Sequence, residues 1–275
     1  MIRLTGFADE ISKDLTEQLD VLESESMRFL ELRGVWGKNV STFTDDEVSQ
    51  IRDTLQARNV GVSCIGSPIG KIGINDDFDE HLKRFERALW CAKRLDAPYI
   101  RIFSFFVPKG EARSYRDEVL RRLRSLAERA EKEGIILLHE NEKEIYGDVP
   151  ERCLDIVESV GSPNLRLVWD PANFVQVGIK TPYDAGYEML RPYIEYIHVK
   201  DALFENGQNV PAGEGDGQIP ETVAALRDSG FDGFFSMEPH LQVAERFSGF
   251  SGPELFKKAT QAFKAILKDA GVEWV

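Results

Sequence analysis

Short apolar segments alternate with amphipathic helical segments eight times along this chain of 275 residues. The apolar segments are rich in β-branched and aromatic residues and are bounded by Gly, Pro, Asp or Asn, as is typical of β-strands. We predict strands at residues 2–8, 28–33, 60–65, 99–105, 135–140, 165–169, 193–200 and 233–238. This alternation is the strongest constraint on the fold.

Helix signals fill the intervals between the predicted strands. Thr44 and Glu47 are spaced as a capping box before a helix that ends near Arg58. Residues 79–96 and 111–133 repeat apolar positions every three to four residues, and a last helix is expected at residues 253–271. Proline suits the first turn of a helix and glycine the position after its end. These signals are Pro150, Pro182 and Pro220, and Gly134, Gly161 and Gly230.

Repeated strand–helix units imply parallel strands joined by right-handed crossovers. A doubly wound open sheet would fit the alternation, but it usually has a glycine-rich nucleotide-binding sequence after its first strand, and residues 5–9 contain only Gly6. Closed eight-stranded barrels are typically about 250 residues long. We therefore predict the α/β class, with a single (β/α)8 barrel domain over residues 1–275.

Composition narrows the classes of partner. A formal net charge of −13 disfavours binding to nucleic acid, which relies on clustered Lys and Arg. No apolar stretch approaches the roughly 20 residues that cross a bilayer, and the N-terminal segment does not resemble a signal peptide. Three scattered cysteines are expected to be buried, reduced thiols. We expect a cytoplasmic enzyme that binds neither nucleic acid nor membranes.

Glu140, Asp170, His198 and Glu238 lie at or next to the carboxyl ends of the last four predicted strands, and barrels of this kind place their chemistry at those ends. Three carboxylates and one imidazole suit a hard or borderline divalent cation. A lone acid at such a position is more often a helix N-cap, and Asp170 before Pro171 fits that role. Burying all four together without a cation would be costly. We predict one divalent metal ion, Mn²⁺ first, with Mg²⁺, Co²⁺ or Zn²⁺ as alternatives.

This series of strand ends resembles the xylose-isomerase-like TIM barrel superfamily of sugar phosphate isomerases and epimerases, most specifically over residues 139–240. The resemblance implies that the four residues bind one metal. It further implies that Glu140 and Glu238 exchange protons with opposite faces of a small-molecule sugar or sugar derivative. The implied reaction is isomerisation or epimerisation next to a carbonyl, through an enediolate held by the metal. It also makes a homo-oligomer possible.

Five further residues are candidate substrate contacts. Lys200 lies two residues beyond His198 and shares its side of a regular strand. We expect His240 at the rim of the pocket, and Glu31 and Arg101 as contacts to sugar hydroxyls, although ion pairing or filling of the barrel interior would also explain these side chains. The fifth candidate is Asn173.

Two departures from the ketose epimerases bear on the substrate. Asn173 and Phe204 stand where those enzymes have a substrate-binding histidine and arginine, so the substrate is expected to differ in shape from a free ketohexose. The segment Gly213-Glu214-Gly215-Asp216-Gly217 resembles a phosphate loop, but its two acids would repel phosphate. We therefore expect an unphosphorylated sugar.

Other functions remain open at this stage. The same metal could support a dehydratase or lyase that acts on a keto-sugar, inosose or ketoglycoside. A Schiff-base aldolase using Lys200 is disfavoured, because neighbouring acids would keep that lysine protonated. An endonuclease of this superfamily needs more histidines than the four in the chain. A sugar-binding barrel without catalytic activity is disfavoured by the presence of both Glu140 and Glu238.

Overall fold

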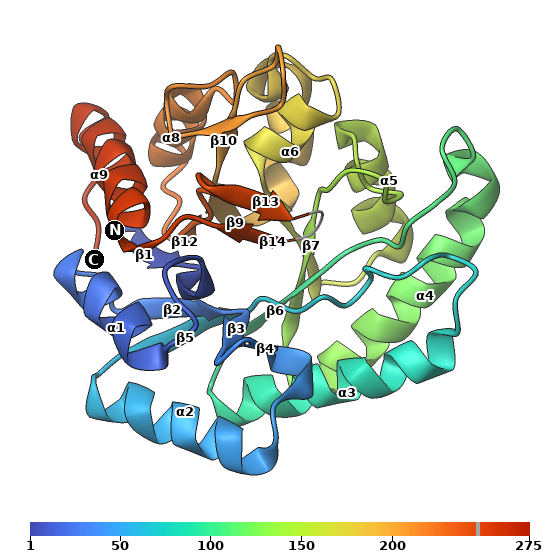
Figure 1. Cartoon of the computed structure of the whole chain (residues 1–275). Helices are drawn as coiled ribbons and strands as arrows, with labels where there is room; N and C mark the ends of the chain where they lie inside the picture. Colours follow the sequence, from blue (N-terminus) through green and yellow to red (C-terminus); the bar gives the residue numbers. More distant parts are fainter. Residues whose placement is uncertain (246–247) are drawn as a thin grey trace.

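The structure, a computed structural model, describes residues 1–245 and 248–275. Eight parallel strands form a nearly closed barrel with helices around it, as predicted (Figure 1). Hydrogen bonds connect the strands in the order β1-β12-β9-β8-β7-β6-β5-β2, and a parallel bridge between Phe7 and Glu31 joins the two ends of that series. The strands are β1 (Arg3–Gly6), β2 (Phe29–Leu32), β5 (Gly61–Ile65), β6 (Tyr99–Ile102), β7 (Ile136–Glu140), β8 (Leu165–Trp169), β9 (Ile194–Val199) and β12 (Phe234–Met237).

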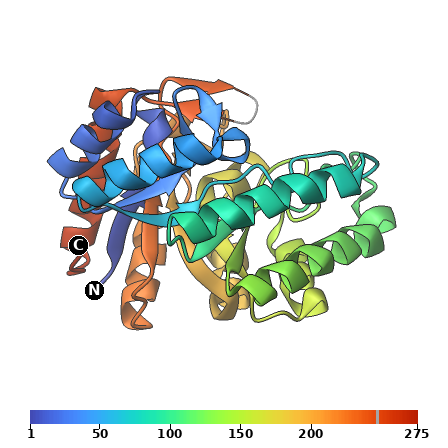
Figure 2. The ribbon, with the colours of Figure 1, turned by 90° about the horizontal axis from the view of Figure 1, so that it is seen from below.

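Helices pack around the outside of the barrel, and Figure 2 shows α2, α3 and α4 side by side along one flank. Their apolar faces and those of the strands form the main core. The described helices are α1 (Leu15–Ser24), α2 (Asp45–Ala57), α3 (Phe78–Arg94), α4 (Ala112–Glu133), α5 (Pro150–Val160), α6 (Pro171–Gln176), the short α7 (Glu188–Leu190), α8 (Ile219–Asp228) and α9 (Pro253–Asp269). No helix in the described residues is both long enough and apolar enough to cross a membrane.

Most local helix signals are confirmed. Thr44 and Glu47 form a reciprocal capping box at the start of α2. Gly134 and Gly161 follow α4 and α5 in the left-handed conformation, with φ values of 69° and 67°. Pro182 also begins a helical segment, which continues as a single turn of π-helix (Tyr183–Tyr187).

The predicted strand over residues 99–105 is too long. β6 ends at Ile102, and Phe105 has a φ of +67°, which an extended strand excludes. Beyond the ends of the neighbouring strands β5 and β6, the backbone N–H groups of Phe103 and Phe105 donate to the carbonyl groups of Ile69 and Gly70. Residues 69–72 are thereby held against residues 103–106 at the mouth of the barrel.

Three short hairpins that the sequence did not predict follow the carboxyl ends of the strands. β13 (Val243–Glu245) and β14 (Ser248–Phe250) lie across the barrel opening in Figure 1. The other hairpins are β3 (Gly34–Val35) with β4 (Lys38–Asn39), and β10 (Asp201–Ala202) with β11 (Asn209–Val210).

The barrel interior changes from apolar to polar along its axis. Cys64, Leu138, Val168, Tyr196 and Phe234 form a buried apolar cluster inside it. The hydroxyl of Tyr196 donates to Glu31, which lies toward the carboxyl ends of the strands. The two chain termini lie together at the opposite end, where Ile2 pairs with Trp274 (Figures 1 and 2). The polar end of the barrel is therefore the place for chemistry.

Candidate metal centre

The four predicted metal ligands converge on one point inside the barrel mouth. Glu140 ends β7, Asp170 follows β8, His198 lies in β9 and Glu238 follows β12. Nδ1 of His198 lies 3.3 Å from Oε2 of Glu238, 3.5 Å from Oε1 of Glu140 and 4.0 Å from Oδ2 of Asp170. All four side chains are buried, and their donor atoms lie within 4.8 Å of one another.

This donor set fits a divalent cation. Ligand bonds of about 2.0–2.2 Å place neighbouring donor atoms roughly 3 Å apart, close to the separations around His198. Nδ1 of His198 is buried and makes no hydrogen bond with the described residues, although three carboxylates surround it. A buried polar atom without a partner is unfavourable, and a cation at the centre of the four donors would satisfy it.

Two local motifs hold the carboxylates in place. Asn141 and Asp170 exchange hydrogen bonds of 2.8 and 3.1 Å, which connect the ends of β7 and β8. Asp170 is also the N-cap of α6: its Oδ1 accepts a hydrogen bond from the backbone N–H of Asn173. Its Oδ2 remains directed at His198. The N-cap and ligand interpretations of Asp170 are therefore compatible, because they use different oxygens.

The second ring nitrogen of His198 faces Glu31. Oε2 of Glu31 lies 3.5 Å from Nε2 of His198 and accepts a 2.9 Å hydrogen bond from Tyr196. Glu31 is fully buried in this position, with an exposed fraction of 0%. A carboxylate behind a metal-binding histidine fixes the orientation of the ring. This position suits an orienting role for Glu31 better than the predicted contact with substrate.

Burial and the neighbouring charges shift the pKa values of the four donor residues in opposite directions. Burial raises the pKa of Glu140, but His198 and Arg101 outweigh it and bring the pKa to about 2. Burial lowers the pKa of His198, but the surrounding carboxylates, Glu140 first, raise it well above 6.5. Burial is the main cause that raises the pKa of Asp170 to about 6, against the influence of Lys200. Without a metal, a cationic His198 therefore lies among the carboxylates.

Three of the predicted substrate contacts surround this cluster. Nζ of Lys200 lies 2.6 Å from Oδ2 of Asp170, and these carboxylates keep its pKa raised despite burial. Nη1 of Arg101 lies 3.1 Å from Oε2 of Glu140 and 3.7 Å from Oε1 of Glu238. The Asn173 amide donates a 3.1 Å hydrogen bond to Oε1 of Glu140.

His240 lies at the edge of the site with a residue that the site prediction left out. Nε2 of His240 lies 3.4 Å from Oε1 of Glu238 and 3.2 Å from Oε1 of the buried Glu10. The backbone N–H of His240 also donates to Glu10. Gly249 packs against this imidazole so closely that a Cβ there would lie 1.8 Å from Cδ2 of His240. Glu10 and the hairpin β13–β14 thus place His240.

Arg33 is a second residue that the site prediction left out. It donates to Asp9 at 2.8 Å and to Oε1 of Glu238 at 3.2 Å. Asp9, Glu10 and Arg33 were visible in the sequence as the polar ends of the first two strands. The sequence did not indicate that these strand ends lie next to Glu238, which is more than 200 positions away along the chain.

The glycine-rich segment 213–217 is ordered around a carboxylate of the chain itself. Asp201 accepts hydrogen bonds of 2.8, 3.1 and 2.9 Å from the backbone N–H groups of Gly213, Gly215 and Gly217. A Cβ at Gly215 would lie 2.3 Å from Oδ1 of Asp201. These amides therefore bind Asp201, next to Lys200 in the chain, and hold the end of β9.

Three related sequences have enzyme names. The chain is 38% identical over 101 residues to a 2-epi-5-epi-valiolone 7-phosphate 2-epimerase of Actinoplanes sp., covering 36% of this chain and 35% of that protein. It is 23% identical over 192 residues to a probable L-ribulose-5-phosphate 3-epimerase of Mycoplasma pneumoniae, with 67% and 62% covered. It is 24% identical over 229 residues to a 3-dehydroshikimate dehydratase of Bacillus anthracis, with 76% and 79% covered. The matched part of the chain thus spans less than two thirds of the length of the two epimerase relatives.

Solved structures share the whole fold. An IOLI protein with a bound zinc atom superposes with a TM-score of 0.76 at 17% identity, over 98% of each chain. A xylose isomerase-like TIM barrel protein of Mycobacterium smegmatis in complex with magnesium gives a TM-score of 0.72 at 16% identity, over 98% of this chain and 97% of the other.

The profile of one protein family matches residues 22–266, and that family is described as xylose isomerase-like TIM barrel. This match covers most of the chain and includes all four donors of the candidate metal centre. The chain therefore belongs to the family of xylose isomerase-like TIM barrels.

Proposed function

We propose that this protein is a divalent-metal-dependent sugar isomerase or epimerase that transfers a proton next to a carbonyl group. The observation that carries the proposal is the convergence of Glu140 and Glu238 with Asp170 and His198 in one buried cluster. Two relatives with epimerase names support the reaction class, and the reaction needs a base and an acid at the carbon that is inverted.

The four converging donors would hold the metal, with Mn²⁺ as the first choice. Such an ion acts as a Lewis acid on a carbonyl and an adjacent hydroxyl, which acidifies the neighbouring carbon-bound proton. Oxygen and imidazole donors are compatible with several divalent metals, so availability contributes to the choice.

Glu140 and Glu238 are the proposed proton-transfer residues. They project from strands on different sides of the barrel mouth, and the Arg101 guanidinium lies near both carboxylates, at 3.1 and 3.7 Å. In the metal-free site, His198 and Arg101 keep the pKa of Glu140 low, at about 2, so this side chain is an ionised carboxylate that can accept a proton. Asn173 fixes the orientation of Glu140 by donating to its Oε1.

Lys200 is the proposed proton donor or hydrogen-bond donor toward substrate oxygen. Its ammonium lies between Asp170 and Glu238, at 2.6 and 3.3 Å, and the raised pKa keeps it protonated. A protonated lysine does not form a Schiff base, which argues against the aldolase alternative. His240, beside Oε1 of Glu238, is the proposed contact at the rim.

A dehydratase is the second candidate, and two observations favour it. The dehydratase relative covers 76% of this chain, more than either epimerase relative described above. The ammonium of Lys200 could also protonate a departing hydroxyl after a carboxylate has removed the neighbouring proton, which gives water and a double bond.

Incubation of the manganese-loaded protein in heavy water with ketoses, inososes and keto acids, followed by NMR, tests the proposal. Deuterium at one carbon with an inverted or isomerised product supports the isomerase or epimerase. A new double bond supports the dehydratase. If no compound exchanges a proton while the metal is shown to be bound, the proposed reaction is wrong.

A further inference from the structure

A groove of about 780 Å³ opens next to the metal centre and is lined by residues from several loops at the barrel mouth. Arg33 and Arg101 are part of its lining, and both also lie within 4 Å of Glu238. The groove therefore leads directly to one of the proposed proton-transfer residues. Its volume is in the range of binding sites for small molecules.

The charged residues that line the groove are mostly basic, unlike those of the chain as a whole, although Lys38 is paired with Glu47. The chain has 47 acidic and 34 basic residues. Among the charged residues that line the groove, only Asp9 is acidic, whereas the basic ones are Lys13, Arg33, Lys38, Lys71 and Arg101. Electrostatic focusing in such a concave site favours an anionic ligand.

Two of these cations, Lys13 and Arg101, have spare hydrogen-bonding capacity. None of the carboxylates in the described residues forms an ion pair with the ammonium of Lys13. Nε of Arg101 is buried and has no hydrogen-bond acceptor among the described residues. Arg33 pairs with Asp9, and Lys71 lies 3.3 Å from Glu142. A ligand that brings acceptor oxygens would satisfy donors that the protein leaves unused.

The wall that carries Lys71 has a fixed backbone. Gly70, with φ of +91°, packs so tightly that a Cβ there would lie 2.0 Å from the carbonyl oxygen of Phe103. The backbone N–H of Gly70 donates to Nε2 of His81, and Nζ of Lys71 lies 4.2 Å from the centre of the Phe103 ring. Lys71 is therefore held at the groove by its surroundings.

We infer that this groove binds an anionic group of the substrate, a phosphate or a carboxylate, through Lys13, Lys71 and the two arginines. The inference rests on the proposed function, because a divalent metal that compensates Glu140 and Glu238 would leave Arg101 with surplus positive charge, whereas Arg33 would keep Asp9 as its partner. It replaces the expectation of an unphosphorylated sugar, which considered only the acidic segment 213–217.

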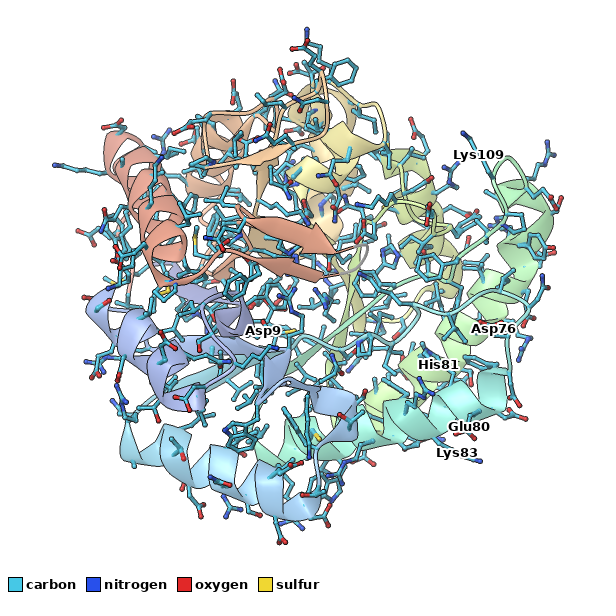
Figure 3. All side chains as sticks on the ribbon, in the orientation of Figure 1. Asp9, Asp76, Glu80, His81, Lys83 and Lys109 are labelled. Carbon is cyan, nitrogen blue, oxygen red and sulfur yellow. The ribbon has the colours of Figure 1, made fainter. Side chains whose placement is uncertain are left out.

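Titration calorimetry on the manganese-loaded protein tests this inference without turnover. The probes are inorganic phosphate and acetate, followed by D-fructose 6-phosphate, 5-keto-D-gluconate and neutral D-fructose. The variants are Lys13→Gln, Lys71→Gln and the double variant. Lys109→Gln is the matched control, because Lys109 is exposed on a loop far from Asp9 and the groove (Figure 3).

We expect the double variant to weaken binding of one anionic probe by at least about tenfold, and high salt to weaken it too. The double variant should bind D-fructose with unchanged affinity. The Lys109→Gln control should bind every probe with unchanged affinity. Tighter binding of phosphate probes identifies a phosphate, and tighter binding of carboxylate probes identifies a carboxylate. If no anion binds, or if anions bind equally well to the double variant, the inference is wrong. Binding without proton exchange in heavy water would instead contradict the proposed reaction alone.

Discussion

The ammonium of Lys200 lies 2.6 Å from Oδ2 of Asp170, the same oxygen that faces Nδ1 of His198. The ammonium also lies 3.3 Å from Oε2 of Glu238. Lys200 thus supplies positive charge at two of the oxygens proposed to bind the metal. In the protein without metal, it offsets part of the negative charge that the barrel buries.

Lys200→Gln is therefore expected to destabilise the metal-free protein more than the metal-loaded protein. Removing one partner of a buried ion pair typically costs about 3–5 kcal/mol, because the other charge is left uncompensated. A bound dication would compensate Asp170 in its place. Urea denaturation in EDTA and in excess Mn²⁺ measures the free energy of unfolding of the metal-free and the metal-loaded protein. The exposed Lys180→Gln is the control. If Lys200→Gln lowers the free energy of unfolding equally in both conditions, Lys200 does not compensate the charge of the metal-binding carboxylates.

Glu140→Gln and Glu238→Gln are each expected to reduce proton exchange with substrate by more than about a thousandfold, because an amide cannot act as the base. The overall fold should persist, since glutamine has nearly the same volume. Exchange is measured by NMR in heavy water and metal content by elemental analysis, with the exposed Glu205→Gln as control. A variant that retains near-normal exchange would have no acid–base role.

The sequence was sufficient to predict the barrel because each strand and helix carries its own local signal. Periodic apolar residues, the Thr44–Glu47 capping box and the glycine that follows α4 are all local features. The four converging donors could be predicted for a related reason. In a barrel of parallel strands, residues at the carboxyl ends of successive strands lie around one opening.

What the sequence could not provide was pairing between distant segments. Arg33 contacts Glu238, and Glu10 contacts His240, across more than 200 residues. The cations of the groove come from four separate parts of the chain, near Lys13, Arg33, Lys71 and Arg101, so they do not form one local cluster in the sequence. The glycines at positions 213–217 were interpreted by their spacing, but the anion that they bind, Asp201, lies on another segment.

Glu31→Gln is expected to lower metal affinity by about tenfold to a hundredfold, because Glu31 faces the ring nitrogen of His198 that does not point at the proposed ion. Tyr196→Phe, which removes the hydrogen bonds of this hydroxyl with Glu31 and Ser63 but leaves Glu31 in place, should have a smaller effect. Metal titration with a fluorescent competitor measures affinity, and steady-state kinetics at saturating metal gives KM. A raised KM with unchanged metal affinity would instead support the sequence-based prediction that Glu31 contacts the substrate.

Metal binding is expected to release protons and to strengthen as pH rises. Carboxylates around His198, Glu140 first among them, overcome burial and raise the pKa of His198 well above 6.5, so the metal-free imidazole is protonated at neutral pH. The metal requires the neutral ring, so binding must displace that proton. Burial raises the pKa of Asp170 to about 6, so a second proton competes below that pH. The dependence of affinity on pH should therefore become steeper in acid.

Calorimetry in two buffers of different ionisation enthalpy counts the released protons. About one proton per metal is expected at neutral pH, with a larger number below pH 6, where Asp170 is also protonated. In Asp170→Asn, the extra release in acid should disappear while the release from His198 remains. Metal binding that releases no proton at neutral pH would contradict the displacement of a proton from His198 by the metal.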